Sequence, residues 1–355
     1  MRILGIETSC DESSAAVVES GRRVLSNVVA SQEELHVPYG GVVPEIACRA
    51  HLEAILPTIE SALRKAKVRL EEADALAVVY RPGLIGSLLI GLTAAKTLAW
   101  ACRKPLIGVD HIRAHLYASA LGEDPFPFPA VGLVVSGGHT SMFHCRSPID
   151  VERLGATTDD AAGEAFDKVA NLLNLGYPGG PVIDRVAREG DPDAIRFPRS
   201  YLEPGSLDFS FSGLKTAVLY HCRGMPHTTS KRRRKGDPRS FSAGAASPDG
   251  PGTFSEKEIA DIAASFQEAV VDVLVDKALD ACRRSGETRL IVGGGVACNS
   301  RLRERLAEMG RREGIRLCLP ERRYCPDNAA MVAGVAHPMA EAERFADLTL
   351  DAQSR

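Results

Sequence analysis

The stretch Arg2-Ile-Leu-Gly-Ile-Glu7-Thr-Ser-Cys-Asp-Glu12-Ser-Ser-Ala-Ala-Val-Val18 sets the expected fold, because it joins two apolar runs through a polar segment. Apolar runs bounded by Ser, Thr and Asp predict a strand, a polar turn and a returning strand. The same order recurs about 130 residues later, where 130–135 and 141–145 flank Ser136-Gly-Gly-His-Thr140. A pattern repeated at this distance predicts a duplicated α/β fold with two lobes.

The two lobes are expected at 1–122 and 123–325, with the last helix, within 326–345, returning to the first lobe. The proline-rich segment 125–129 marks the expected boundary between them. Residues 223–255 hold a run of Lys and Arg followed by Gly, Ser and Pro, which predicts a flexible surface insertion. Its basic run could contact nucleic acid, and a solvated loop explains it equally well.

The composition is that of an ordinary globular protein. The 355 residues are 45% hydrophobic and 25% charged, and the formal net charge of -3 gives no overall nucleic-acid signature. The nine cysteines include no C-x-x-C pair, which favours reduced thiols in a cytoplasmic protein. No signal peptide is expected. The apolar stretch from Leu84 to Ala101 is interpreted as a buried helix and not as a membrane span, because small and polar residues interrupt it.

A pair of histidines follows another apolar run. Residues 105–110 predict a strand that leads directly into a helix carrying His111 and His115. Side chains four residues apart share one face of a helix, and two imidazoles at this spacing can hold one zinc or iron ion. The third ligand must come from elsewhere, and Asp327 offers a carboxylate, although an Asp before a helix is also an ordinary N-cap. Two unrelated helix histidines remain the alternative.

The polar segment after the first strand has the composition of a phosphate-facing loop. Its backbone amides and hydroxyl groups could face the phosphates of a nucleotide, and a plain hairpin with a polar tip is the alternative. Asp11 and Glu12 would repel a bare anion. They therefore fit better beside a metal ion or as a base for an incoming nucleophile.

Glycine-rich turns open two further helices. Residues 176–181 precede Asp184, whose carboxylate could accept hydrogen bonds from ribose hydroxyls. Three glycines at the end of a predicted strand precede Asn299, which could hydrogen-bond an adenine. The run lacks the G-x-G-x-x-G spacing of dinucleotide-binding folds. Asp167 lies too deep in its predicted helix to be a simple cap.

Taken together and in order, these motifs resemble those of the bacterial TsaD family, once described as O-sialoglycoprotein endopeptidases. The motifs are Ile6-Glu-Thr-Ser-Cys-Asp-Glu12, His111-x-x-x-His115, Val135-Ser-Gly-Gly-His139, Gly293-Gly-Gly-Val-Ala-x-Asn299 and Asp327-Asn-Ala-Ala-Met331. The resemblance covers roughly residues 1–336 apart from the insertion, and it implies a two-lobed ASKHA (actin-like, RNase H-like duplicated) α/β fold.

The resemblance also implies an activity. Enzymes of this family transfer the threonylcarbamoyl group from threonylcarbamoyl-AMP to N6 of adenosine 37 in tRNAs that read ANN codons, which forms t6A. It implies partners of the TsaB and TsaE type, a TsaC type enzyme that supplies the adenylate, and no membrane association. It implies one Fe²⁺ or Zn²⁺ ion on His111, His115 and Asp327. Asp11 or Glu12 could orient or deprotonate the acceptor amine. The residues that would bind the adenylate are Val134, Val135, Ser136, Gly137, Gly138, Asp167, Gly180, Asp184 and Asn299.

Three positions depart from the family pattern. Arg81 stands where glycine is usual, and Pro326 replaces the Thr that commonly precedes the metal-binding Asp. Val134 occupies the position of a tyrosine metal ligand in archaeal relatives, so water or substrate would complete the coordination shell.

Three other functions compete with this reading. A zinc metalloprotease would need Glu after the first histidine, and Ile112 stands there. A small-molecule kinase on the same fold would not need the two histidines together with Asp327. A non-catalytic partner subunit would be expected to have lost the metal ligands.

Overall fold

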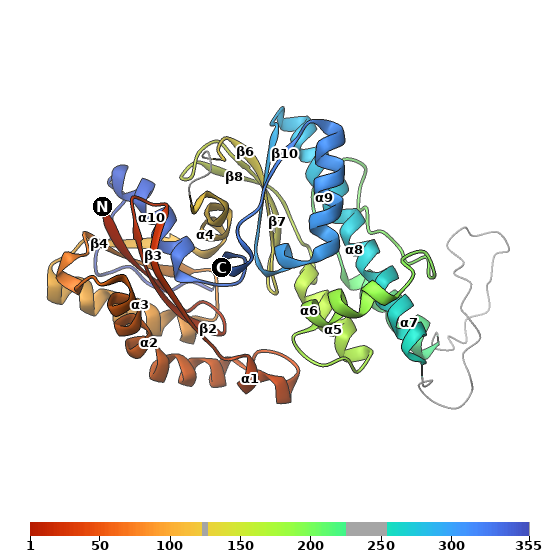
Figure 1. Cartoon of the computed structure of the whole chain (residues 1–355), viewed down its shortest axis with the longest axis horizontal. Coiled ribbons are helices and arrows are strands. Elements are labelled where there is room, and N and C mark those ends of the chain that lie inside the picture. Colours follow the sequence, from red (N-terminus) through yellow and green to blue (C-terminus); the bar gives the residue numbers. More distant parts are fainter. Residues whose placement is uncertain (123–126, 225–253, 355) are drawn as a thin grey trace.

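In the computed structural model, which describes residues 1–122, 127–224 and 254–354, the chain forms two five-stranded sheets (Figure 1). The first sheet has the order β3-β2-β1-β4-β5 and the second the order β10-β9-β6-β7-β8. Read from opposite ends, both contain an antiparallel three-strand meander followed by two parallel strands. This correspondence, strand for strand, confirms the duplicated α/β fold predicted from the repeated pattern.

The strands of the first sheet are β1 Arg2–Glu7, β2 Glu12–Glu19, β3 Arg23–Ser31, β4 Ala75–Arg81 and β5 Leu106–Asp110. Those of the second are β6 Ala130–Val135, β7 Thr140–Cys145, β8 Val151–Ala156, β9 Arg289–Gly293 and β10 Arg316–Cys318. Sequence analysis missed β8 and β10, which are the two edges of the second sheet. Their side chains are largely exposed or half-buried, so they lack the apolar runs that mark the central strands.

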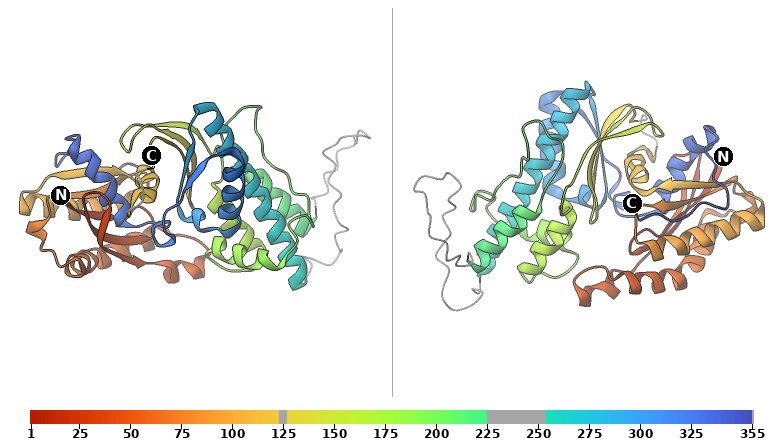
Figure 2. Two further views of the ribbon diagram at one scale, coloured as in Figure 1. Left: turned by 45° about the horizontal axis from the view of Figure 1, so that its top comes forward. Right: turned by 180° about the vertical axis from the view of Figure 1, so that it is seen from behind.

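Helices cover both faces of the first sheet (Figures 1 and 2). Alternate residues of β1 explain this, since Ile3 joins one apolar cluster whereas Leu4 and Ile6 join another. The first face carries α4 (His111–Tyr117) and α10 (Ala329–Glu341), and the second carries α2 (Pro44–Ala66) and α3 (Ile85–Cys102). The segment after the second lobe thus packs against the first sheet.

A glycine permits the close packing of α10. A Cβ atom on Gly5 of β1 would lie 2.5 Å from the carbonyl oxygen of Ala329 and 2.9 Å from the Cβ of Ala333. The α10 helix begins at 329, with the Asn328 side chain accepting a hydrogen bond from the Met331 amide. The N-cap is therefore Asn328, and the alternative N-cap role of Asp327 is wrong.

The α3 helix is the one helix of the described residues that is long and apolar enough to cross a membrane by length and composition. In the structure it packs against β4 and α2 through small and medium side chains, with Ser87, Gly91 and Ala95 buried. Its opposite face is exposed, and Trp100 is 71% accessible. The prediction of a buried helix is thus wrong for that face, because only one side of α3 meets the sheet.

The second lobe is built around a long helix, α8 (Glu256–Ser285), which packs beside β6 (Figure 1). The other helices of this lobe are α5 Ala162–Leu172, α6 Gly179–Val186, α7 Ser212–Arg223 and α9 Ser300–Glu313. The remaining short elements are α1 Glu33–His36, η1 Val37–Tyr39, η2 Leu70–Glu72, η3 Ala118–Ala120, η4 Ala187–Glu189, η5 Gly295–Cys298 and η6 Arg322–Tyr324. Most of the expected insertion 223–255 and part of the expected boundary 125–129 lie outside the described residues.

Two features place the functional site between the lobes. The α4 helix contacts β5 of the first sheet and also β6 and β9 of the second. The chain end follows the first sheet, since the Gln353 amide donates to the Tyr80 carbonyl at 2.9 Å and Ala346 forms a bridge with Leu106. The C-terminal end lies between the lobes, as the views of the chain show (Figures 1 and 2).

Candidate functional site

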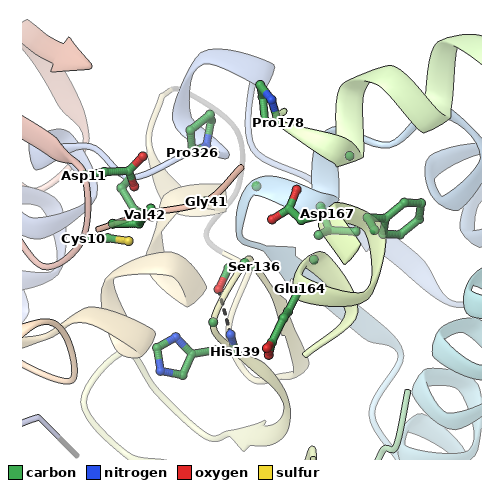
Figure 3. Close-up of a pocket in the computed structure, with 18 of the residues that line it drawn as sticks. Cys10, Asp11, Gly41, Val42, Ser136, His139, Glu164, Asp167, Pro178 and Pro326 are labelled. Carbon is green, nitrogen blue, oxygen red and sulfur yellow. Dashed lines mark hydrogen bonds between the residues drawn. The ribbon is translucent and has the colours of Figure 1, made fainter. Parts of the chain in front are cut away.

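A cavity of about 1080 Å³ lies between the two lobes. Figure 3 shows Cys10 and Asp11 on its first-lobe side, across from Glu164 and Asp167 of α5. Parts of the following segments line it: 9–12, 40–42, 82–84, 136–139, 163–168, 177–184, 295–299 and 326–327. Every loop that sequence analysis assigned to a ligand therefore borders one cavity, as expected for loops at the carboxyl ends of strands.

His111, at the start of α4, borders this cavity, and His115 lies one turn further along the same helix, fully buried and outside the lining. The Asp110 side chain caps α4 by accepting hydrogen bonds from the amides of Ile112 at 3.0 Å and Arg113 at 3.3 Å. Asp327, just before α10, completes a group whose ligand atoms all lie within 4.8 Å of one another. Its Oδ1 is 3.1 Å from Nε2 of His115 and 3.6 Å from Nε2 of His111. The structure brings together the three predicted metal ligands.

A buried carboxylate orients the first of these histidines. Oε2 of Glu7 lies 2.9 Å from Nδ1 of His111, and the Glu7 side chain is fully buried. Because the carboxylate only accepts, Nδ1 carries a hydrogen, and Nε2 is the ring nitrogen that faces Asp327. The other oxygen of Glu7 accepts from the Ser9 amide at 2.6 Å. Sequence analysis missed Glu7, although an acid that ends an otherwise apolar strand was a usable signal.

The three side chains of the group shift one another's pKa values. Desolvation lowers the pKa of His111, but the Asp327 and Glu7 carboxylates outweigh it and raise this pKa to about 9. Burial and the charge on His111 lower the pKa of His115. Desolvation opposes ionisation of Asp327, but the two histidines hold its pKa well below the usual range. The Asp327 carboxylate is thus ionised beside a histidine ring that favours its charged form.

This donor set fits one zinc or iron ion. Two imidazole nitrogens and one carboxylate oxygen converge in a buried position, and the outer nitrogen of one imidazole donates to a carboxylate, as is usual for metal-binding histidines. Close packing holds the group rigidly. A Cβ on Gly293 at the end of β9 would lie 2.3 Å from the His115 carbonyl oxygen, so only glycine lets the second lobe approach α4 here.

Asp11 and Glu12 both border the cavity beside this group. Burial raises the pKa of Glu12 well above its usual value, and the nearby charges of Asp327 and Asp11 raise it further. Figure 3 shows the Asp11 carboxylate beside Val42 and Cys10. An acid with a raised pKa beside a cation site is suited to proton transfer.

The Ser136–Gly138 turn presents an open backbone to the cavity. The Ser136 amide donates to the His139 carbonyl at 2.7 Å, and the Ser136 hydroxyl accepts from the His139 amide at 3.2 Å (Figure 3). Cβ atoms added to Gly137 or Gly138 would meet nothing within 4 Å, so a ligand can approach these residues closely. Val134 and Val135 are fully buried within β6 and do not border the cavity. The structure therefore does not bring these two predicted residues to the site.

Asp167, Gly180 and Asp184 reach the cavity from α5 and α6. Burial raises the pKa of Asp167 to about 6, although its Oδ1 accepts a 2.8 Å hydrogen bond from the Gly179 amide. Oδ1 of Asp184 accepts from both the amide and the hydroxyl of Ser300, at 3.0 and 2.7 Å. Part of its hydrogen-bonding capacity is thus used within the protein.

Asn299 borders the cavity, but its side chain is engaged at both ends. Its Oδ1 caps α9 by accepting from the Leu302 amide at 2.9 Å, and its Nδ2 donates to Oε1 of Gln267 at 2.7 Å. The predicted hydrogen bond from this side chain to an adenine would have to compete with both contacts. The backbone of the preceding glycines, by contrast, is open at Gly295.

Two of the three departures from the family pattern, Arg81 and Val134, have simple structural accounts. Nε of Arg81 lies 3.2 Å from Oδ2 of Asp110, so the arginine pairs with the residue that caps α4. Pro326 borders the cavity opposite Pro178 (Figure 3). Val134 packs with Leu116 and Cys145 in a small apolar cluster and cannot act as a ligand.

The sequence model of one protein family, described as "TsaD: tRNA N6-adenosine threonylcarbamoyltransferase", matches residues 23–334. A relative of that name from Symbiobacterium thermophilum is 50% identical over 350 residues, which cover 99% of this chain and 95% of the relative. Another from Syntrophobacter fumaroxidans is 48% identical over 100% of this chain and 99% of the relative.

Two solved structures share the fold at low sequence identity. Full-length HypF in a phosphate- and nucleotide-bound form matches with a TM-score of 0.60 and 15% identity, covering 97% of this chain and 47% of that one. Component A of the (R)-2-hydroxyglutaryl-CoA dehydratase of Acidaminococcus fermentans matches with a TM-score of 0.51 and 13% identity, covering 96% and 99%. These likenesses are consistent with the ASKHA fold.

Proposed function

The chain belongs to the TsaD family of tRNA N6-adenosine threonylcarbamoyltransferases, and on this premise we propose that its interlobe cavity binds threonylcarbamoyl-AMP and transfers the threonylcarbamoyl group to N6 of adenosine 37 in tRNAs that read ANN codons. The observation that carries this assignment is the convergence of His111, His115 and Asp327 beside that cavity, which His111 and Asp327 border. The product is t6A.

The donor is a mixed anhydride with AMP as its leaving group. In the transfer, the amine nitrogen forms a bond to the carbamoyl carbon, the bond from that carbon to the phosphate oxygen breaks, and the amine loses one proton. We assign the open backbone of Ser136, Gly137 and Gly138 to the AMP half of the donor, since glycine turns admit phosphate groups closely. Asp167, Gly180 and Asp184 would face its ribose.

Asp11 and Glu12 are assigned to the acceptor amine. Both border the cavity, Asp11 in the turn after β1 and Glu12 at the start of β2. The raised pKa of Glu12 makes its ionised form a stronger base than an ordinary carboxylate. One of the two would orient the amine and the other would take its proton.

His111, His115 and Asp327 would hold one Fe²⁺ or Zn²⁺ ion. When bound, such an ion polarises a carbonyl group and offsets phosphate charge. The role of Glu7 is to fix the His111 ring by accepting from Nδ1, which leaves Nε2 free as a ligand atom. The protein residues otherwise exclude water and set the geometry of the donor.

The protein would act in the cytoplasm with tRNA and with partners of the TsaB and TsaE type, while a TsaC type enzyme supplies the adenylate. Exposed apolar side chains on α2 and α3 support a protein partner of the TsaB type, since Leu52 and Leu56 are 69% and 60% accessible and Trp100 lies on the neighbouring helix. The nine cysteines are all free thiols, which supports the cytoplasm. The TsaE and TsaC types follow from the family resemblance alone.

The lobes are assigned to 1–122, with 326–345 returning, and to 123–325. The packing of α10 on β1 supports this division. The kinase and metalloprotease alternatives are not favoured, because relatives of closely similar length carry the transferase name. Ile112 also stands where a zinc protease needs its glutamate.

The test supplies the purified chain with partner subunits, threonine, bicarbonate, ATP, the adenylate-forming enzyme and unmodified tRNA. Nucleosides from the tRNA are then measured by mass spectrometry. We expect t6A with the natural tRNA and none with a matched tRNA that carries guanosine at position 37. ATP turnover that transfers phosphate to a small molecule, with no t6A, would instead support the kinase.

A further inference from the structure

We propose that His51 is a positioning residue, which holds the β1–β2 connection carrying Asp11 and Glu12 through the Cys10 carbonyl in the turn and through Ser13 at the start of β2. The inference rests on the role proposed above for the two acids. His51 lies on α2, outside the cavity lining, and borders neither the metal group nor the glycine turns.

The contacts of His51 lie on both sides of the acidic pair. Nε2 of its ring is 3.0 Å from the Cys10 carbonyl oxygen, and Nδ1 is 2.7 Å from Oγ of Ser13. Both His51 and Ser13 are fully buried. One ring therefore spans the segment in which Asp11 and Glu12 lie, and it fixes the residue before the pair and the residue after it.

The direction of each hydrogen bond follows from the acceptor. A carbonyl oxygen can only accept, so Nε2 carries the ring hydrogen and donates to Cys10. Nδ1 then has a free lone pair and accepts from the Ser13 hydroxyl. Burial lowers the pKa of His51 and keeps the ring neutral, which is the state this arrangement needs. The ring thus connects the turn at Cys10 with the start of β2 at Ser13 in a single defined tautomer.

Other contacts hold the remainder of the loop. The Ser9 carbonyl accepts from the Leu84 amide at 2.8 Å, and the Asp11 carbonyl accepts from the Gln32 amide at 3.1 Å. A Cβ on Gly83 would lie 2.6 Å from the Ser9 carbonyl oxygen, so the segment before the acids is closely packed. His51 supplies the link at Cys10, between these two anchors.

Positioning of this kind affects the reaction more than donor binding. The acids face the acceptor amine, and a displacement of about 1 Å in a reacting group can reduce turnover by about a hundredfold. The donor contacts assigned to the second lobe do not involve this loop. Loss of the Cys10 contact should therefore lower kcat and leave KM for the donor almost unchanged.

Two substitutions separate the contacts. In His51→Gln the side-chain amide can take the place of Nε2 and still donate to Cys10. In His51→Asn the amide oxygen can take the place of Nδ1 and accept from Ser13, but the donor to Cys10 is lost. Ile59→Val is the matched control, because Ile59 is a buried core residue of the same helix, and shortening it weakens packing without touching the loop.

Steady-state kinetics of t6A formation, thermal unfolding and metal content would be measured for all four proteins. We expect His51→Asn to lower kcat about ten- to a hundredfold with donor KM within about twofold, and His51→Gln to keep kcat within about threefold. Ile59→Val should match wild type in kcat despite its lower stability. Equal kcat values for His51→Asn and His51→Gln, or losses that follow stability alone, would overturn the proposal.

The acid variants separate this proposal from the acceptor role. Asp11→Asn and Glu12→Gln could keep wild-type kcat while His51→Asn lowers it. In that case the role of the two acids at the acceptor amine is wrong, and His51 positions a different residue of the same segment. If an acid variant loses kcat and His51→Asn does not, the acceptor role stands and the positioning role is wrong.

Discussion

Oε2 of Glu7, at the end of the first strand, lies 2.9 Å from Nδ1 of His111, the first residue of α4. The contact joins the N-terminal strand to the metal group through a fully buried carboxylate. It holds a hydrogen on Nδ1 of His111 and directs Nε2 toward Asp327. An ion held by this group would thereby be linked to the same chain segment that leads to Asp11 and Glu12.

Glu7→Gln should weaken metal retention while the fold is kept. A glutamine still accepts from the Ser9 amide, but it no longer supplies the negative charge that holds the His111 ring. Loss of such an outer partner typically lowers metal affinity about ten- to a hundredfold. Competition with a chelator, followed by metal analysis, measures this directly. Glu53→Gln, an exposed change on α2, is the control, and equal retention in both variants would contradict the role of Glu7.

Asp167→Asn should stabilise the protein at neutral pH and lower its activity. Burial raises the folded-state pKa of Asp167 from 3.8 to about 6, so the folded protein binds more protons than the unfolded chain between these values. Stability therefore falls as the pH rises through that window, and the loss persists above it. The asparagine removes the buried charge and can still accept from Gly179.

We expect Asp167→Asn to be more stable than wild type by on the order of 1 to 2 kcal/mol at pH 7.5, with a smaller difference at pH 5. Urea unfolding at the two pH values measures both. The exposed Asp193→Asn serves as the matched control. A difference that does not change with pH would show that desolvation of Asp167 is not its cause.

Substitutions at Asn299 should lower the stability of the protein by weakening the cap of α9, with little effect on KM for the donor. Asn299→Ala removes the helix cap and leaves Oε1 of Gln267 without its donor, which should cost about 1 to 2 kcal/mol of stability. Asn299→Ser keeps an oxygen acceptor for the cap and should lose less. If Asn299→Ser instead raises donor KM tenfold at nearly wild-type stability, this side chain does contact the donor.

Leu56→Lys should weaken binding of a TsaB type partner and leave the isolated chain stable. The Leu56 side chain is 60% accessible on α2, so a charge there is solvated in the free protein but would be buried in an interface. Titration calorimetry with the purified partner measures the effect. Leu348→Lys, at another exposed apolar residue, is the control. Unchanged affinity for Leu56→Lys would place the partner elsewhere.

Much of the fold follows from local patterns. The two hairpins, β1–β2 and β6–β7, are apolar runs with polar turns, so their repetition was visible in the sequence. The edge strands β8 and β10 were not, because exposed strands lack an apolar signature. His111, His115 and Asp327 were found through motif and resemblance. Glu7 was missed although its place at the end of an apolar strand was a signal, and His51 became visible only with its contacts across the fold. Asn299 is the opposite case. The sequence assigned its side chain to a ligand, but in the fold that side chain hydrogen-bonds the Leu302 amide and Gln267.

The most direct test of the central claim is t6A formation by wild type and by His111→Ala, with the metal content of each preparation measured in parallel. The partner subunits, the adenylate-forming enzyme and unmodified tRNA are the same in both reactions. We predict t6A and bound metal for wild type, and neither for a folded His111→Ala protein. Wild-type levels of t6A from a metal-free His111→Ala protein would contradict the account.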